Sequence, residues 1–191
     1  MKINVKRALL ALCLVAVVMV GSIAGTIAWL TATSGTVTNT FTTGDINITL
    51  AESTGTDYKA IPGAQIDKDP TVTVVANSEA CYVYALVENN LLVDNNSVAT
   101  FTVGDDWVVV KTEGTKTLYQ YKEVVASSTA DQKLSPVFTK VTIADTVTKD
   151  NIGQLNEKTV IVNAYAHQSA NTTEAVADAA AIAWAFPAAS N

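Results

Sequence analysis

Apolar and polar residues alternate along most of the chain after residue 36. A period of two places successive side chains on opposite faces of an extended strand. Ile46, Ile48 and Leu50 share one parity and predict an early strand, and Gly44 can host the bulge at which the parity of the preceding residues changes. Further strands are expected after Pro70 and at 81–87, 107–111, 118–125, 137–143 and 159–168, giving about eight in all.

The segment 81–87 is apolar on both of its faces. One face carries Cys81, Val83, Ala85 and Val87, and the other carries Tyr82, Tyr84 and Leu86. A strand that is buried on both faces lies in the interior of a sheet. We therefore expect this strand to be central.

Turn-forming residues separate the predicted strands. The stretch 52–69 contains several of them, including Pro62 and Gly63, and is predicted to be a loop with a Pro-Gly turn. A second loop is expected at 94–97. The hairpin formed by 107–111 and 118–125 is predicted to close through Glu113, Gly114 and Thr115.

One helix is predicted, near the C-terminus. Asn171 can cap it and Glu174 completes a capping box, while 175–186 consists almost entirely of good helix formers. This helix is too short to span a membrane, so we expect it to pack on an edge or an end of the sheet. The fold class that follows is all-β, a jelly-roll-like antiparallel β-sandwich with a short C-terminal helix.

The N-terminus has the order of a secretory signal peptide. Lys2, Lys6 and Arg7 precede an uninterrupted apolar run at 8–20, and small residues follow. An uncleaved anchor is the alternative, because the apolar stretch extends to Leu30 and is then long enough to cross a bilayer. The residue pairs that suit signal peptidase are Ser22/Ala24, Thr26/Ala28 and Ala32/Ser34.

Charge argues against a nucleic-acid partner. The chain has 12 Lys and Arg residues and 18 Asp and Glu residues, a formal net charge of -6. Removing the three basic residues of the leader leaves 9 basic residues against the same 18 acidic ones, which gives -9. Binding to phosphate backbones requires clustered basic residues, and here they are sparse and scattered.

The residues give no pattern typical of an active site. Cys13 lies in the leader, so Cys81 is the only thiol of the exported chain, and its alternating neighbours favour core packing. His167 is the only histidine, which excludes a two-histidine zinc motif and leaves a partly exposed structural imidazole as our interpretation. We expect no catalytic residue and no cofactor.

Acidic residues in turns are weak calcium candidates. They are Asp67, Asp69, Asp94, Asp105 and Asp106. Their spacing does not match that of an EF-hand loop, and solvated turn carboxylates are the simpler interpretation.

Several short motifs occur together in one order along the chain. They are Gly-Thr-Ile-Ala at 25–28, Phe-Thr-Thr-Gly-Asp-Ile-Asn-Ile at 41–48, Ile-Pro-Gly at 61–63, Asp-Lys-Asp-Pro-Thr-Val at 67–72, Tyr-Val at 82–83 and Asn-Ala-Tyr-Ala at 163–166, before an alanine-rich helix with Trp184. In this order and spacing the chain resembles the TasA/camelysin family. The resemblance covers most of the chain, except the middle hairpins.

The resemblance implies a function and a route of export. TasA-like proteins are jelly-roll sandwiches that are exported through a SipW-type signal peptidase and assemble into extracellular biofilm matrix fibres. By analogy, cleavage would follow Ala28 or Trp29, leaving a signal peptide at 1–28 and a single domain at 29–191. The expected partners are other copies of the chain, the signal peptidase and other matrix proteins, and the expected location is the extracellular matrix or cell surface.

The arm at 29–43 is suited to strand addition. From Trp29 to Phe41 it contains no proline and no charge but five Thr residues and Val37, so it can pair with a sheet edge of the next subunit while Val37 and Phe41 enter apolar pockets. One alternative is a monomeric binding module, secreted or tethered to the surface. A camelysin-like metalloprotease is the other, but a single histidine gives it no support.

Overall fold

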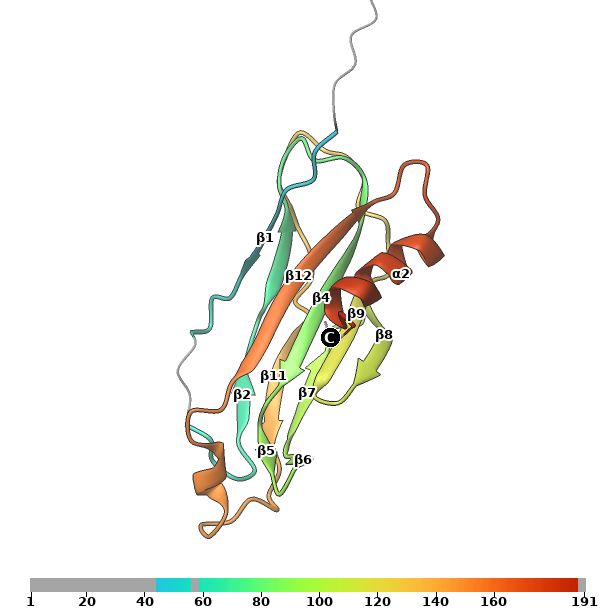
Figure 1. Ribbon diagram of the computed structural model, residues 1–191. Coiled ribbons are helices and arrows are strands. Elements are labelled where there is room, and N and C mark those ends of the chain that lie inside the picture. Colours follow the sequence, from blue (N-terminus) through green and yellow to red (C-terminus); the bar gives the residue numbers. More distant parts are fainter. Residues whose placement is uncertain (1–43, 56–58, 189–191) are drawn as a thin grey trace, which may run out of the picture. The chain divides into compact units, whose positions relative to one another are not determined.

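The computed structural model describes residues 44–55 and 59–188 (Figure 1). The chain divides into two units, Met1–Thr42 and Thr43–Asn191, and all described residues belong to the second. The predicted signal peptide, its cleavage site at Ala28 or Trp29, and the arm with Val37 and Phe41 lie outside the described residues.

The second unit has an all-β, sandwich-like fold with one short C-terminal helix, as expected. Its described strands number twelve rather than eight, and every pairing between them is antiparallel. The strands are β1 (Ile48–Ala51), β2 (Gln65–Asp67), β3 (Thr71–Val74), β4 (Cys81–Asn89), β5 (Leu92–Val93), β6 (Asn96–Ser97), β7 (Ala99–Val103), β8 (Trp107–Glu113), β9 (Lys116–Tyr121), β10 (Gln132–Lys133), β11 (Phe138–Ile143) and β12 (Val160–Gln168). A 3-10 helix, η1 (Ile152–Leu155), precedes β12, and α2 (Glu174–Ala185) follows it.

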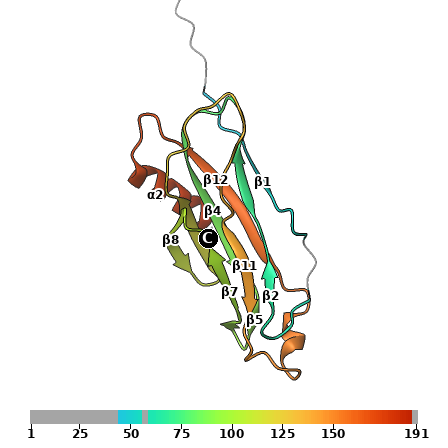
Figure 2. The same ribbon diagram turned by 180° about the vertical axis from the view of Figure 1, so that it is seen from behind.

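The first layer combines two short sheets, β1-β3-β10 and β2-β11-β7 (Figure 2). Main-chain hydrogen bonds continue between the two sheets, from Lys68 to the carbonyl of Thr139 at 3.0 Å and from Val137 to the carbonyl of Pro70 at 2.9 Å. Strands β2 and β3 therefore follow one path across the layer, with a break at 68–70.

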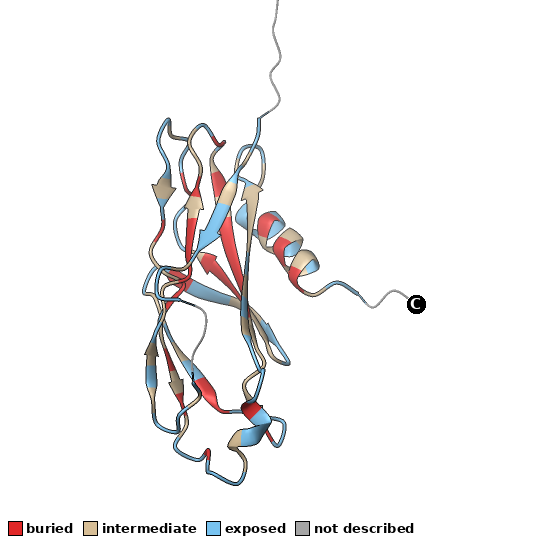
Figure 3. Cartoon of the chain, turned by 90° about the vertical axis from the view of Figure 1, so that its left-hand side faces the viewer, coloured by how far each residue is buried: buried red, intermediate tan, exposed pale blue. Residues whose placement is uncertain are grey.

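The second layer is the sheet β12-β4-β9-β8, in which β4 lies between β12 and β9. The prediction that 81–87 is central is confirmed. Val83 and Ala85 face the first layer and are fully buried in the main core, whereas Tyr84 and Leu86 belong to a second core beneath α2. Figure 3 shows this burial along β4.

The main core fills the space between the layers. Val72, Val83 and Val137 are fully buried there, and Phe138 packs against Phe101 with a ring separation of 4.9 Å. Each such side chain contributes about 1.5–3 kcal/mol by its removal from water. The alternating pattern predicted these positions because one face of each strand is covered by the opposite layer.

Helix α2 packs on the outer face of the second layer, so the prediction of an edge or end position is wrong. Its buried residues are Ala177, Ala181 and Ala185, four positions apart. Their small side chains let the helix backbone approach Tyr84 and Leu118 closely, because residues at this spacing lie on one face of a helix. Within the described residues, neither helix is long and apolar enough to cross a membrane.

The predicted capping box does not form. Thr173 is the N-cap residue and makes no side-chain capping hydrogen bond. Asn171 lies earlier, in a left-handed turn with φ of 57°. The carboxylate of Glu174 instead accepts a hydrogen bond of 2.9 Å from Gln120 of β9, so tertiary contact replaces the local cap.

Two predicted loops differ in detail from the structure, and one strand was not expected. The predicted loop at 52–69 contains β2, and the predicted loop at 94–97 is part of a tight hairpin, with φ of 50° at Asp94 and 62° at Asn95. Strand β7 was not predicted. The expected turn at Pro62-Gly63 and the hairpin closed near Gly114 are confirmed, with φ of 72° and 58° at the two glycines.

Candidate strand-acceptor groove

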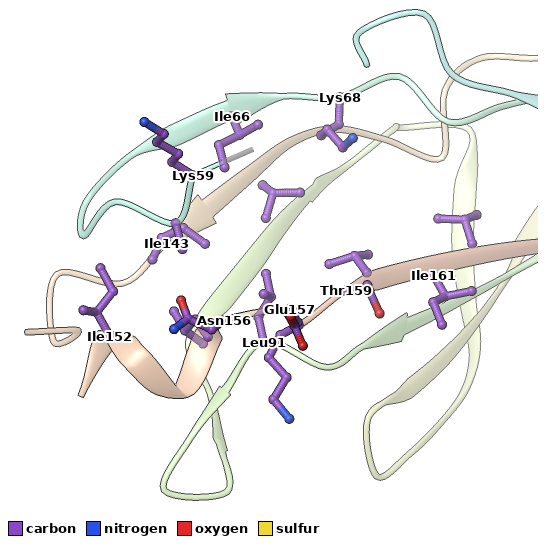
Figure 4. Close-up of a pocket in the computed structure, with 16 residues that line it drawn as sticks. Lys59, Ile66, Lys68, Leu91, Ile143, Ile152, Asn156, Glu157, Thr159 and Ile161 are labelled. Atoms are coloured by element: carbon purple, nitrogen blue, oxygen red, sulfur yellow. The ribbon is translucent and has the colours of Figure 1, made fainter. Parts of the chain in front are cut away.

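A groove of about 990 Å³ opens between β2 of the first layer and β12 of the second, at the end of the sandwich that carries η1 (Figure 4). Its apolar lining comes from every element around it: Ala60, Ile66, Leu91, Val141, Ile143, Ile152, Leu155, Val160, Ile161 and Val162. The groove is thus an extension of the main core that reaches the surface between two sheet edges.

Four charged residues belong to the described lining of the groove. Lys59, Lys158 and Glu157 are exposed, whereas Lys68 is largely covered and forms an ion pair with Glu52 at 2.8 Å. The apolar interior favours an occupant without charged side chains, because burying an unpaired charge is costly.

The outer edge of β2 borders this groove. Ala64 accepts a hydrogen bond from Ile143 at 2.9 Å and Lys68 donates one to Thr139 at 3.0 Å, so the even-numbered residues of this segment pair with β11. In an antiparallel ladder the alternate residues turn their N–H and C=O groups the other way. The main-chain groups of Gln65 and Asp67 therefore face away from β11, and among the described residues no strand pairs with that edge.

Strand β1 occupies the corresponding edge position in the other half of the layer. It pairs with β3 from Ile48 opposite Val74 to Ala51 opposite Thr71. It ends there, although β2 continues along the same path. Among the residues that the structure describes, the first layer therefore has an edge strand beside β3 and no strand beside β2, and we call this second place the open strand position.

Side-chain carboxylates mark the point at which β1 ends. The Asp69 carboxylate accepts hydrogen bonds from the N–H groups of Ser53 at 2.8 Å and Thr54 at 3.1 Å, and from the Ser53 hydroxyl. Together these bonds lower the pKa of Asp69 from 3.8 to about 2, and the bond from the Ser53 hydroxyl has the largest effect. The Glu52 carboxylate accepts from the N–H of Asp69 at 3.4 Å.

The far end of the groove is closed by η1, which a reciprocal pair of hydrogen bonds holds in place. Gln154 donates to the Asp94 carboxylate at 3.1 Å, and its own side-chain oxygen accepts from the N–H of Asp94 at 3.0 Å. Ile152 and Leu155 of η1 are thereby fixed against the groove.

The opposite edge of the second layer is less suited to accept a strand. The pairing of β8 with β9 shifts register between Val109 and Lys111, which bends this edge. Lys111 and Glu113 also form an ion pair there at 2.6 Å. A bulge and charged side chains are the usual protection of an exposed edge strand.

The weak calcium candidates lie in separate places. Asp67 pairs with Lys140 at 3.3 Å, Asp69 binds Ser53 and Thr54, and Asp94 lies at a hairpin turn. Asp105 and Asp106 lie in the turn between β7 and β8. Within the described residues, no three side chains of His, Cys, Asp or Glu form a group that could hold a metal ion.

The two residues considered for nucleophilic or metal chemistry lie apart from the groove lining. Cys81 is fully buried on the inner face of β4, and burial raises the pKa of its thiol to about 11. His167 is partly exposed on β12, where its Nδ1 lies 2.9 Å from the carbonyl oxygen of Gln168. The geometry assigns neither residue a chemical role.

The sequence did not predict the groove, because 52–69 was interpreted as a loop. Ala64 and Ile66 alternate with Gln65 and Asp67, which is the pattern of a strand, but a pattern of four residues is too short to distinguish a strand from a loop. Comparison of the chain with protein-family models, with curated proteins and with solved structures finds no match.

Proposed function

We propose that this protein is a secreted structural subunit of an extracellular matrix, such as that of a biofilm, and that it forms fibres by strand addition. The arm at 29–43 of one copy takes the open strand position beside β2 of the next copy. The observation that carries the proposal is an edge of β2 with which no described strand pairs, beside a groove whose described lining is largely apolar. The resemblance to the TasA/camelysin family supports the same function.

The composition of the arm fits the groove. Residues 37–41 place Val37 and Phe41 on one side of an extended strand, and the arm has no charge to bury. Its main chain would pair with Gln65 and Asp67, as in other cases of strand addition at a sheet edge. Burying Val37 and Phe41 contributes about 1.5–3 kcal/mol for each side chain.

The positions of donor and acceptor favour head-to-tail growth. The described chain begins at Gly44, beside Glu79 and near the end of β12, whereas the groove lies at the start of β12 (Figure 1). The nine residues of β12 span about 30 Å between the two ends. A contact between different surfaces of identical subunits does not close on itself, so repetition gives a filament.

Export is part of the proposal. The leader at 1–28 has the charge and apolar order of a signal peptide, and a SipW-type signal peptidase would release the arm by cutting after Ala28 or Trp29. The proposed location is therefore the extracellular matrix or the cell surface, with other copies and other matrix proteins as partners.

Electron microscopy tests the proposal directly. Negative-stain images of concentrated 29–191 protein are compared with images of a variant that lacks 29–39. We expect filaments only from the protein with the arm. Filaments from both proteins would contradict strand donation, whereas monodisperse particles from both would contradict the fibre function and favour a monomeric binding module.

A further inference from the structure

A second pocket, of about 420 Å³, borders the opposite edge of the first layer from the groove. In the sheet β2-β11-β7 the groove borders β2, and this pocket borders β7. We call it the hairpin pocket, because residues of the β5–β6 hairpin and of the β8–β9 hairpin both line it. Six of its eleven described lining residues carry an uncharged amide or hydroxyl group: Asn89, Asn95, Ser97, Thr115, Thr117 and Tyr119.

The described lining of the hairpin pocket fits a neutral, polar ligand. It contains no charged side chain, so it offers no partner to a phosphate, a carboxylate or an ammonium group. Its amides and hydroxyls can both donate and accept hydrogen bonds, and Phe101 and Tyr119 add flat apolar surfaces. Many neutral hydroxyl groups around an apolar ring are the chemistry of a sugar. The volume lies within the range of about 300–1,000 Å³ that is usual for small-molecule sites.

Asn89 holds both hairpins that form the pocket. Its N–H donates to the carbonyl of Thr115 at 2.8 Å, in the turn between β8 and β9. Its side-chain amide donates to the Ser97 hydroxyl of β6 at 2.8 Å and accepts from the N–H of Leu91 at 3.1 Å. The walls of the pocket are therefore set before a ligand binds, which lowers the ordering cost of binding.

Side chains cover part of the β7 edge beside the pocket. Ile143 lies opposite Ala99 but donates to Ala64, so Ala99 turns its main-chain groups away from β11. The carbonyl of Ala99 accepts from the Ser97 hydroxyl at 3.1 Å and from the Asn89 amide at 3.4 Å. A strand added beside β7 would need this carbonyl. The edge is thus less suited to a peptide than to a compact ligand with hydroxyl groups.

We propose that the hairpin pocket binds one or two sugar residues of a neutral oligosaccharide or polysaccharide. The side chains of Asn95 and Thr115 form no hydrogen bond with the described residues, so their donors and acceptors are available to sugar hydroxyls. Phe101, which packs on Phe138 with a ring separation of 4.9 Å, is held in position to contact the ring of the sugar. This inference holds whether or not the protein forms fibres.

NMR titration of dilute, ¹⁵N-labelled 29–191 protein tests the inference. The neutral probes are cellotetraose, maltotetraose and tri-N-acetylchitotriose, and tetragalacturonate is the acidic counterpart. We expect at least one neutral sugar to cause saturable shifts of the Asn89, Phe101 and Thr115 amide signals. Tetragalacturonate should bind at least tenfold more weakly than that sugar, because the described lining has no cation to pair with its carboxylates.

A double variant and a matched control separate binding from a change in structure. Asn95→Gly removes the amide and keeps the backbone, since glycine readily adopts the φ of 62° found there. Combined with Thr117→Val, which removes a hydroxyl, it should weaken sugar binding at least tenfold. Asn77→Gly with Thr100→Val makes the same two changes outside the lining, at a residue with φ of 64° and on the exposed side of β7, and should bind like the unmodified protein. If the double variant does not fold, each single variant is measured instead.

Three results would overturn the inference. The first is the absence of saturable shifts at the pocket amides with all three neutral sugars. The second is an equal loss of binding in the double variant and its control. The third is a response of these amides to the peptide Thr-Val-Thr-Asn-Thr-Phe, the sequence of residues 36–41, without any response to the sugars. That result would assign the pocket to strand addition.

Discussion

The hydroxyl of Tyr84 donates a hydrogen bond of 2.8 Å to the carboxylate of Asp178 and so joins the central strand β4 to helix α2. Tyr84 is fully buried, and its ring lies 6.0 Å from that of Tyr165, which stacks on Trp184 at 5.2 Å. Burial, followed by the bond to Asp178, raises the pKa of Tyr84. The helix is therefore fastened to the sheet by a polar contact within an apolar interface.

Tyr84→Phe removes this contact without leaving a cavity. We expect the free energy of unfolding to fall by about 1–2 kcal/mol, because a hydrogen bond to a charged group is lost while Asp178 keeps access to water. Urea denaturation followed by Trp fluorescence measures the change. Tyr121→Phe is the matched control, since the Tyr121 hydroxyl makes no hydrogen bond with the described residues, and an equal loss in both variants would contradict the prediction.

The close approach of α2 to the sheet predicts a strong effect of side-chain size. Ala181 is fully buried against the second core, whereas Ala179 is exposed on the same helix. We expect Ala181→Leu to lower the free energy of unfolding by about 1–3 kcal/mol, because the larger side chain pushes the helix from the sheet. Ala179→Leu should change the unfolding midpoint little, and equal midpoints for the two variants would show that the interface is not tightly packed.

The low pKa of Asp69 predicts an acid-dependent contribution to stability. The folded-state pKa is about 2 and the ordinary value is 3.8, so the folded state favours the ionised form. The contribution is present above about pH 4 and is lost as the pH falls through 2. We expect the difference in free energy of unfolding between the unmodified protein and Asp69→Asn to shrink over this range, as measured by denaturation at several pH values. A difference that is constant from pH 6 to pH 2 would mean that the carboxylate bonds do not form in solution.

Ile66 provides a test of the groove that leaves the arm intact. It lines the groove from β2, whereas Ile61 is 55% exposed and lies outside the lining. In 29–191 protein, Ile66→Glu should abolish filaments or raise the concentration they require at least tenfold, because the arm would pack against a buried charge. Light scattering against concentration measures this. Ile61→Glu adds the same charge nearby and should assemble like the unmodified protein, so a matching defect in both variants would argue against the groove as acceptor.

Local patterns predicted several of the strands that the opposite layer covers, although not β7, whose Ala99 is also buried in the main core. The two apolar faces of 81–87 predicted a central strand because both faces are buried, one by the first layer and one by α2. Gly114 predicted the hairpin turn because a positive φ is needed there. The signal peptide and the arm are predicted from the sequence alone, and both stay predictions.

Tertiary structure decided the features that carry the proposals. The sequence determined which residues are apolar and where the chain turns, but not that Ser53 would lie opposite Asp69, 16 positions away, because such a pairing depends on the register of whole strands. The same holds for the helix, whose Glu174 bonds to Gln120 rather than forming its local cap. Local preferences are worth a few tenths of a kcal/mol to about 1 kcal/mol each, and contacts between distant segments exceed them once the layers pack. The groove likewise depends on how the layers pack, because it is lined by residues of distant segments, among them Ile66 of β2 and Val160 of β12.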